Sequence, residues 1–325
     1  MNGPKVFYVF NRPRWEKQRL YERGRCPDDA LYGMNTLRKR GFTVEFSDDG
    51  HDFSSWRSRL ILPVGDVLSE KGRRVGFHLW QAMTLREKLK RADLIFATAD
   101  SSALPLLRDK AKRRLSAPIV YATIGLAESF PDRRGWIYRY YKELAASADA
   151  LIHYGEAEGR GLIERFGVPR ERVHFVPFGV DTAFYDKAPS YDGPPIALGI
   201  DPRRDWPLLA RALQGTGITM RVYTNPDLLR GINPPAEFER HAPVPSDVVA
   251  DLLAEAAFVV LPVVENSYTG ATITLLSAMA AGKAVIVSRT AAIKRRLRAG
   301  EWAKLRARSA GRRRGATQRN SLFKW

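Results

Sequence analysis

The chain has 325 residues, 45% of them hydrophobic, so it is long enough to form two domains with separate cores. No apolar run approaches the roughly 20 residues of a membrane-spanning helix, and Cys26 is the only cysteine. A disulfide framework and a cysteine metal cluster are therefore excluded, and the Cys26 thiol is expected to be incidental. The first residues lead into a strand without a basic region and cleavage site, which predicts a soluble cytoplasmic protein.

The formal net charge of +18 is concentrated near the C-terminus. Residues 290–325 contain twelve Lys or Arg and one acid, Glu301, so this tail carries +11 and the other 289 residues carry +7. Three interpretations stay open: a solvated or disordered basic arm, an arm that contacts anionic lipid at the inner membrane surface, and out-of-frame translation of a GC-rich gene. The tail shows no groove-reading motif, so specific nucleic-acid binding is not expected.

Short apolar runs alternate with helical patterns in the first half of the chain, as in a parallel sheet wrapped by helices. Between the first two predicted strands, residues 30–40 place Leu31, Met34 and Leu37 on one stripe of a helix that ends at Gly41. Strands are predicted at residues 5–10, 42–46, 60–64, 94–98, 119–124, 150–153 and 174–177.

A second series of strands and helices follows a stretch rich in Pro, Asp, Gly and Ser. A helix is predicted at residues 246–257, with Ser246 as its N-cap. Strands are predicted at residues 196–199, 218–223, 258–261 and 284–287. The fold class is therefore α/β, with two Rossmann-like, doubly wound parallel-sheet domains. The predicted boundaries are a first domain at 1–181, a linker at 182–195, a second domain at 196–289 and a basic tail at 290–325.

The segment between the last two strands reads as a polar loop followed by a helix. Gly270, Ala271 and Thr272 open this helix, so unpaired backbone N–H groups would face the loop, where an anion could bind. The core face of a helix in a doubly wound sheet is the alternative interpretation, but it leaves the loop unexplained. The helix and the strand after it include Leu276, Ser277, Ala278, Met279, Ala280, Ala281, Gly282, Ala284, Val285 and Ile286.

This stretch resembles the donor-sugar motif of GT-B glycosyltransferases, particularly the retaining family 4, whose helix reads roughly Leu-Glu-Ala-Met-Ala-x-Gly before Pro-Val-Ile. Ser277 replaces the glutamate that usually accepts hydrogen bonds from the nucleotide ribose, and the loop suits a looser Asn-x-Tyr-x-x-Gly form. The resemblance implies that the donor is bound by Gly199, Glu265, Asn266, Tyr268, Thr269, Gly270, Ala271, Thr272 and Ser277.

A second similarity follows the first strand of the second domain, where the family has Gly-Arg-x-x-x-x-Lys-Gly. Gly199 matches the glycine, Ile200 replaces the arginine, and Arg203 and Arg204 lie in a shorter loop. The resemblance implies that these two arginines neutralise the nucleotide diphosphate as the sugar leaves, because a guanidinium can hold phosphate oxygens in bidentate fashion. The alternative is a solvated turn in which both arginines pair with the two aspartates of the loop.

The end of the first domain also resembles the family's Gly-Val-Asp-x-x-x-Phe element, through Gly179, Val180, Asp181 and Phe184, although Phe184 comes one position early. Asp181 is placed to cap the following turn. The family's histidine near the transferred sugar is replaced, because Ile124 and Gly125 occupy its position. His153 is a candidate substitute, although a histidine with satisfied hydrogen bonds at a strand end is the simpler interpretation. Glu158 follows that strand and its role is open.

Arg12, Arg14 and Trp15 follow the first strand directly. Loops at the carboxyl ends of strands face the binding crevice in doubly wound folds, so these residues are candidates for acceptor binding, with Trp15 stacking on a sugar. His153 is included in the same candidate site. An exposed, solvated loop is the alternative.

The resemblance implies an enzyme that transfers a sugar from a nucleotide-sugar to a glycan, lipid or small-molecule acceptor with retention of anomeric configuration. It implies neither a protein nucleophile nor a cofactor, and no bound metal. Two alternatives stay open: a non-catalytic relative that binds a nucleotide-sugar or glycan, and a truncated, inactive enzyme whose second domain is incomplete.

Overall fold

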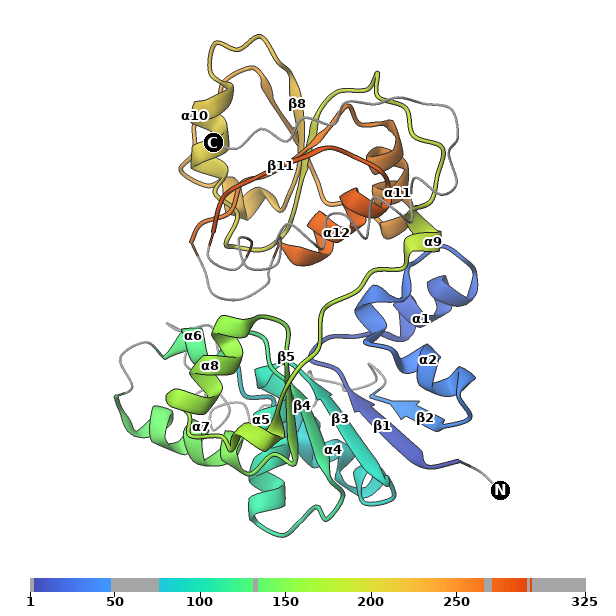
Figure 1. The fold of residues 1–325 in the computed structure, drawn as a ribbon, viewed down its shortest axis with the longest axis vertical. Helices are drawn as coiled ribbons and strands as arrows, with labels where there is room; N and C mark the ends of the chain where they lie inside the picture. The colour runs from blue at the N-terminus through green and yellow to red at the C-terminus, as the bar shows by residue number, and fades with distance from the viewer. Residues whose placement is uncertain (1–2, 48–75, 131–133, 266–270, 291–292, 294–325) are drawn as a thin grey trace. The chain divides into compact units, whose positions relative to one another are not determined.

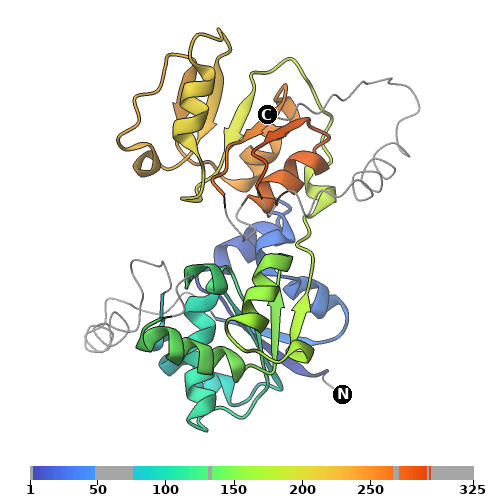
Figure 2. The same cartoon turned by 60° about the vertical axis from the view of Figure 1, so that its left-hand side comes forward.

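The computed structural model describes residues 3–47, 76–130, 134–265, 271–290 and 293 (Figure 1). The chain divides into two compact units. The first contains Met1–Arg19 and Ala30–Pro177, and the second contains Leu20–Asp29 and Phe178–Trp325. Each unit holds a parallel sheet with helices packed against it, so the predicted α/β class with two parallel-sheet domains is confirmed (Figures 1 and 2). The predicted strand at 60–64 and nearly all of the tail lie outside the described residues.

The first unit has a six-stranded sheet in the order β2-β1-β3-β4-β5-β6, with parallel pairing throughout. The chain winds outward from β1 in both directions, which is the doubly wound arrangement. Apolar side chains on both sheet faces are buried, as expected for parallel strands covered by helices. The strands are β1 Lys5–Val9, β2 Thr43–Phe46, β3 Leu94–Thr98, β4 Ile119–Ala122, β5 Ala150–His153 and β6 Val173–Phe175.

The helices of the first part of the chain differ from the prediction at two places, because the segment after the first strand, predicted as a loop, forms helix α1 from Trp15 to Glu22. The helix predicted at residues 30–40 is split, because Tyr32 and Gly33 both have positive φ angles, 52° and 76°. A right-handed helix needs negative φ at every residue, so it cannot continue through these two positions. Only glycine adopts positive φ easily. The described helices are α1 Trp15–Glu22, η1 Asp28–Leu31, α2 Met34–Lys39, α4 Leu79–Leu89, α5 Asp100–Ala111, α6 Leu126–Ser129, α7 Trp136–Ala146, α8 Glu156–Glu164 and η3 Arg170–Arg172.

The second unit has a five-stranded parallel sheet in the order β11-β10-β7-β8-β9. Its strands are β7 Ile196–Leu198, β8 Met220–Tyr223, β9 Phe238–His241, β10 Val259–Leu261 and β11 Val285–Val287. Its helices are α9 Thr182–Tyr185, α10 Trp206–Leu213, η4 Pro226–Leu229, α11 Ser246–Glu255 and α12 Thr272–Ala280. None of the helices described in either unit is long and apolar enough to cross a membrane.

Two predictions for the second unit are wrong. Strand β9 was not predicted, because only Phe238 in its four residues is a buried apolar side chain. Ser246 is not the N-cap of α11, since Pro245 holds that position and no side chain caps the helix. The Ser246 hydroxyl instead lies 3.8 Å from the sulfur of Cys26, which is buried.

The predicted linker packs on the second unit. The Asp181 carboxylate accepts hydrogen bonds from the backbone N–H groups of Ala183, at 3.2 Å, and Phe184, at 3.3 Å, which confirms the predicted cap. The ammonium of Lys283 donates to the carbonyls of Ser190 and Ala254. These bonds fix the linker along α11 and the end of α12.

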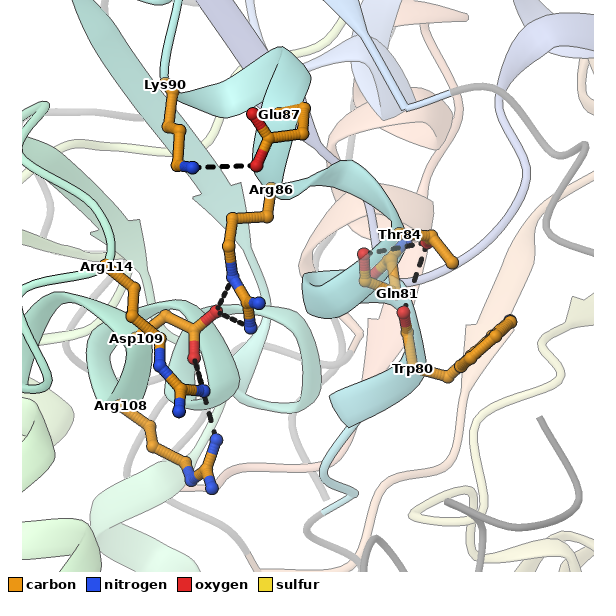
Figure 3. Close-up of polar contacts among 9 residues, drawn as sticks. All are labelled: Trp80, Gln81, Thr84, Arg86, Glu87, Lys90, Arg108, Asp109 and Arg114. Carbon is orange, nitrogen blue, oxygen red and sulfur yellow. Dashed lines mark hydrogen bonds and ion pairs between the residues drawn. The ribbon is translucent and has the colours of Figure 1, made fainter. Parts of the chain in front are cut away.

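Helices α4 and α5 of the first unit are joined by a buried carboxylate, that of Asp109 (Figure 3). Its Oδ2 accepts from Nε and Nη2 of Arg86 at 2.8 and 2.6 Å, and Oδ1 lies 3.6 Å from Arg108 and from Arg114. The Asp109 side chain is 0% exposed, so the three guanidinium groups supply the compensation that a buried charge requires.

Candidate active site

The loop after β7 carries the predicted phosphate-binding arginine, and its shape depends on Gly199. Gly199 has φ 155°, and a Cβ placed there would lie 2.0 Å from Nε of Arg204. Any other residue would therefore push the guanidinium aside. The carbonyl of Gly199 accepts a 2.7 Å hydrogen bond from the Thr224 hydroxyl, which fixes the loop to the end of β8. Glycine is needed here so that Arg204 can lie across the end of β7.

Arg204 is held between β10 and α12. Its Nη2 donates to the hydroxyl of Thr274 at 3.1 Å, and its backbone forms an isolated bridge with Val263, just after β10. Its side chain is mostly buried, at 6% exposure for the residue. A guanidinium in such surroundings interacts more strongly with an anion than one in water does.

The two aspartates of this loop bond to backbone groups. Oδ1 of Asp201 accepts from the N–H of Arg203 at 2.7 Å, and Oδ1 of Asp205 caps α10 by accepting from the N–H of Leu208 at 3.0 Å. Both carboxylates thus shape the turn that presents the arginines. Ile200, which replaces the family's arginine, is 59% exposed.

Helix α12 begins at Thr272, close to the predicted start, and the Thr274 hydroxyl in its first turn accepts from Arg204. Ala271 is its N-cap, and the hydroxyl of Thr272 is buried without a partner among the described residues. The first N–H groups of a helix and its dipole favour an anion at this end. Glu265 lies just before the loop, on the surface. Four of the predicted donor residues, Asn266, Tyr268, Thr269 and Gly270, lie outside the described residues.

Ser277 is buried in the second unit. Its hydroxyl donates to the carbonyl of Ile273 at 2.9 Å, one turn earlier in α12, and also contacts the hydroxyl of Tyr185. Tyr185 in turn donates to Asp29 at 3.3 Å, and Asp29 accepts a 2.6 Å bond from the N–H of Asp181. Burial raises the pKa of Asp29 to about 6. Sequence reasoning missed Asp29, which is distant from these residues in the chain.

The predicted acceptor residues occupy two places in the first unit. Arg14 donates from Nε to the carbonyl of Ala30 at 3.1 Å, Trp15 is 42% exposed, and Arg12 is also on the surface. His153 is buried at the end of β5, with Nδ1 2.8 Å from the carbonyl of Gly155. Burial lowers the pKa of His153, so its ring is neutral near pH 7.

The carboxyl ends of β3, β4 and β5 carry a buried polar cluster that sequence reasoning did not assemble. Oδ1 of Asp100 accepts from the hydroxyls of Tyr121 and Thr123 and from the N–H of Ile124, and Oε1 of Glu158 lies 3.1 Å from the Thr123 hydroxyl. Asp100 and Thr123 could have been found from their positions near the carboxyl ends of the strands predicted at 94–98 and 119–124. Their pairing with Glu158 depends on the packing of α8, which the sequence alone does not give.

Two family models match the chain. The Glycosyltransferase Family 4 model matches residues 34–184, and the Glycosyl transferases group 1 model matches residues 206–310. Together the two matches span more than three quarters of the chain. No curated protein matches the sequence.

Solved structures show the same fold at low sequence identity. HepE of Anabaena, in complex with UDP-glucose, is 14% identical, with 91% of this chain and 83% of that chain covered and a TM-score of 0.60. Sucrose-phosphate synthase of Thermosynechococcus elongatus is 13% identical, with 95% and 90% covered and a TM-score of 0.61. Starch Synthase IV of Arabidopsis thaliana, bound to ADP and acarbose, is 13% identical, with 90% and 84% covered and a TM-score of 0.59.

The two parallel-sheet units and the fold they share with these structures define a GT-B protein. The chain belongs to the GT-B glycosyltransferases, with a family 4 match in its first part and a group 1 match in its second. The resemblance deduced from the sequence is therefore confirmed.

Proposed function

We propose that the chain transfers a sugar from a nucleotide-sugar to an acceptor hydroxyl, with retention of anomeric configuration. The observation that carries this proposal is the placement of Arg204 between the ends of β7 and β10 and the start of α12. The nucleotide diphosphate would bind there, against the guanidinium, the first N–H groups of α12 and the buried hydroxyl of Thr272.

The chemistry requires stabilisation of the leaving group. Negative charge grows on the phosphate as the bond between the sugar's anomeric carbon and the diphosphate oxygen breaks. Fixed positive charge beside the phosphate therefore lowers the activation free energy of this step. The acceptor oxygen bonds to the anomeric carbon on the face that the diphosphate leaves, and the acceptor's proton passes to the leaving phosphate oxygen. This step uses no protein nucleophile and, in our proposal, no metal or other cofactor.

The structural neighbours support this choice of donor. HepE was solved with UDP-glucose, and Starch Synthase IV with ADP, so proteins of this fold bind nucleoside diphosphates with different bases. Neither the base nor the sugar of the present donor follows from these likenesses.

A thermal-shift panel of UDP, GDP, ADP and TDP tests the donor site. A nucleotide at about a hundred times its Kd adds roughly 2.7 kcal/mol to the free energy of unfolding, so one nucleotide should raise the melting temperature clearly. The rise should persist in EDTA, because no metal is required. If no nucleotide and no nucleotide-sugar shifts a cooperative melt, the proposal fails. A shift without subsequent turnover would instead favour a non-catalytic binding relative.

We also propose that the segment after β1 binds the acceptor, since Trp15 is partly exposed and begins α1, the helix that follows this central strand. Changing Trp15→Ala should raise the acceptor's KM about tenfold while the donor's KM stays constant, because stacking is lost without a change at the donor site. Arg14→Ala should act in the same direction. Trp136→Ala, which removes another exposed tryptophan of the same unit, is the control. Equal acceptor KM values in all these proteins would exclude the segment.

The hypothesis that the basic tail, at residues 290–325, contacts an anionic membrane rests on the charge of the sequence. Sedimentation with anionic and with neutral vesicles would test it, and equal binding to both would exclude it.

A further inference from the structure

The buried cluster at the carboxyl ends of β3, β4 and β5 requires one proton beyond those of its hydroxyl and backbone groups. The Thr123 hydroxyl lies 2.9 Å from Oδ1 of Asp100 and 3.1 Å from Oε1 of Glu158. One hydroxyl has one proton and cannot donate to both carboxylates. The second contact is a hydrogen bond only if a carboxyl group donates to Thr123.

The donors around the two carboxyl groups show which one is protonated. Oδ1 of Asp100 accepts from the hydroxyl of Tyr121 and from the N–H of Ile124 at 3.3 Å, in addition to Thr123. Glu158 has one backbone donor, the N–H of Ala127 at 3.1 Å, and its Oε2 has no partner among the described residues. A carboxylate surrounded by donors stays ionised, whereas a buried carboxyl group with few donors takes up a proton.

We propose that Glu158 is a neutral carboxylic acid that donates its proton to Thr123, and that the chain Glu158–Thr123–Asp100 positions the loop from Thr123 to Ala127. Both ends of this loop are held by the two carboxyl groups, through the N–H groups of Ile124 and Ala127. The loop includes Gly125, at φ 87°, and Ile124, which is partly exposed at the end of β4. Glu158 is thus a positioning residue.

The charged surroundings agree with this assignment. Desolvation and the nearby Asp100 raise the pKa of Glu158 to about 7, while Arg165 opposes the shift. Burial also raises the pKa of Asp100, which the bonds from Tyr121 and Thr123 oppose. In the unfolded chain the ordinary value of 4.5 applies to Glu158, so the folded state holds an extra proton between pH 4.5 and about 7. Stability should therefore fall as the pH rises through this window.

A strained backbone supports a role for this edge of the sheet. Ala99, directly before Asp100, has φ 67° and ψ 156°, which is a conformation that non-glycine residues rarely adopt. Its N–H bonds to the carbonyl of Ala122 at 2.9 Å, so the strain is maintained by the same strand ends that carry the cluster. Ligands of doubly wound sheets bind at the carboxyl ends of strands, where this loop lies.

Infrared difference spectroscopy during a pH titration of the whole chain locates the proton. The wild-type protein should show the carbonyl stretch of a protonated carboxylic acid that disappears as the pH rises through about 7, and Glu158→Gln should lack this band. Asp100→Asn should keep this band but lose it at a lower pH than the wild type, because the Asp100 charge raises the pKa of Glu158. A band that survives in Glu158→Gln, or no such band in the wild type, overturns the proposal.

Amide hydrogen exchange provides a second test that distinguishes positioning from packing. Oε1 of Glu158 makes the contacts with both Thr123 and Ala127, so the amide of glutamine can preserve one of the two but not both, and Glu158→Gln should accelerate the exchange of Ile124 and Ala127 only slightly. Glu158→Ala should accelerate both about tenfold, the effect of losing one hydrogen bond. Equal exchange in the alanine and glutamine variants would contradict the proposal.

The effect on catalysis rests on the proposed glycosyl transfer and is measured separately. Turnover by the wild type should decline as Glu158 ionises, whereas turnover by Glu158→Gln should not decline over the same range. If the chain shows no turnover but the infrared band behaves as described, the proposed activity fails and the proton assignment stands.

Discussion

Arg204→Ala should reduce kcat by about a hundred- to a thousand-fold, the usual cost of removing one fixed group that stabilises charge in a transition state. The reason is the position of the guanidinium, which is fixed by Gly199, Val263 and Thr274 and is largely shielded from water. Steady-state kinetics with the nucleotide-sugar found in the thermal-shift panel measures the effect.

Three further variants separate loss of chemistry from loss of folding. Arg204→Lys keeps the charge but loses the planar group, so it should recover part of kcat. Gly199→Ala should resemble Arg204→Ala, because its methyl group would occupy the space of the guanidinium. Arg203→Ala shows how much the neighbouring cation contributes. Wild-type kcat in an Arg204→Ala protein with an unchanged melting temperature would exclude Arg204 from the reaction.

Asp109→Ala should destabilise the first unit by about 3–5 kcal/mol, the cost of breaking a buried ion pair by removing one partner. Three guanidinium groups would then lie close together without the carboxylate that they surround (Figure 3). Urea unfolding followed by tryptophan fluorescence measures the change as a lower midpoint of the transition. The two units need not unfold together, so the transition of the first unit is the relevant one.

Arg114→Ala is the matched control for Asp109→Ala. The Arg114 side chain is 45% exposed and lies 3.6 Å from the carboxylate, so its removal should cost less than about 1 kcal/mol. Arg86→Ala should fall between the two, because it removes both short hydrogen bonds to Oδ2. Similar midpoints for Asp109→Ala and Arg114→Ala would mean that the buried carboxylate contributes little.

The fold could be predicted because its signals are local and repeated. Residues 94–98 and 150–153 are apolar, and the structure has strands there with the same bounds. The errors occur where tertiary packing decides. Tyr32 takes a positive φ that no pattern reveals, and β9 forms from the sequence Phe-Glu-Arg-His because β8 offers it an edge.

The candidate site could be predicted in part. The sequence predicted the start of α12 and the loop that carries Arg204 separately, and the structure brings them together at the sheet edge where loops after parallel strands gather. The environment of Ser277 could not be predicted, because the Tyr185 hydroxyl that contacts it belongs to a residue almost a hundred positions earlier in the chain. Contacts between side chains on distant segments depend on how helices pack, and a single sequence does not specify this.

The assignment of residues 20–29 to the second unit has a practical consequence for dissecting the protein. The polypeptide passes from one unit to the other after Arg19, after Asp29 and after Pro177, so no single cut yields both intact. A fragment beginning at Phe178 would lack three residues that contact it: Asp29, Arg25 and Cys26. These residues bond to the N–H of Asp181, pair with Asp247 and lie beside the Ser246 hydroxyl, respectively. Expression of an independent C-terminal domain would therefore require the decapeptide to be supplied as a fused or circularly permuted segment.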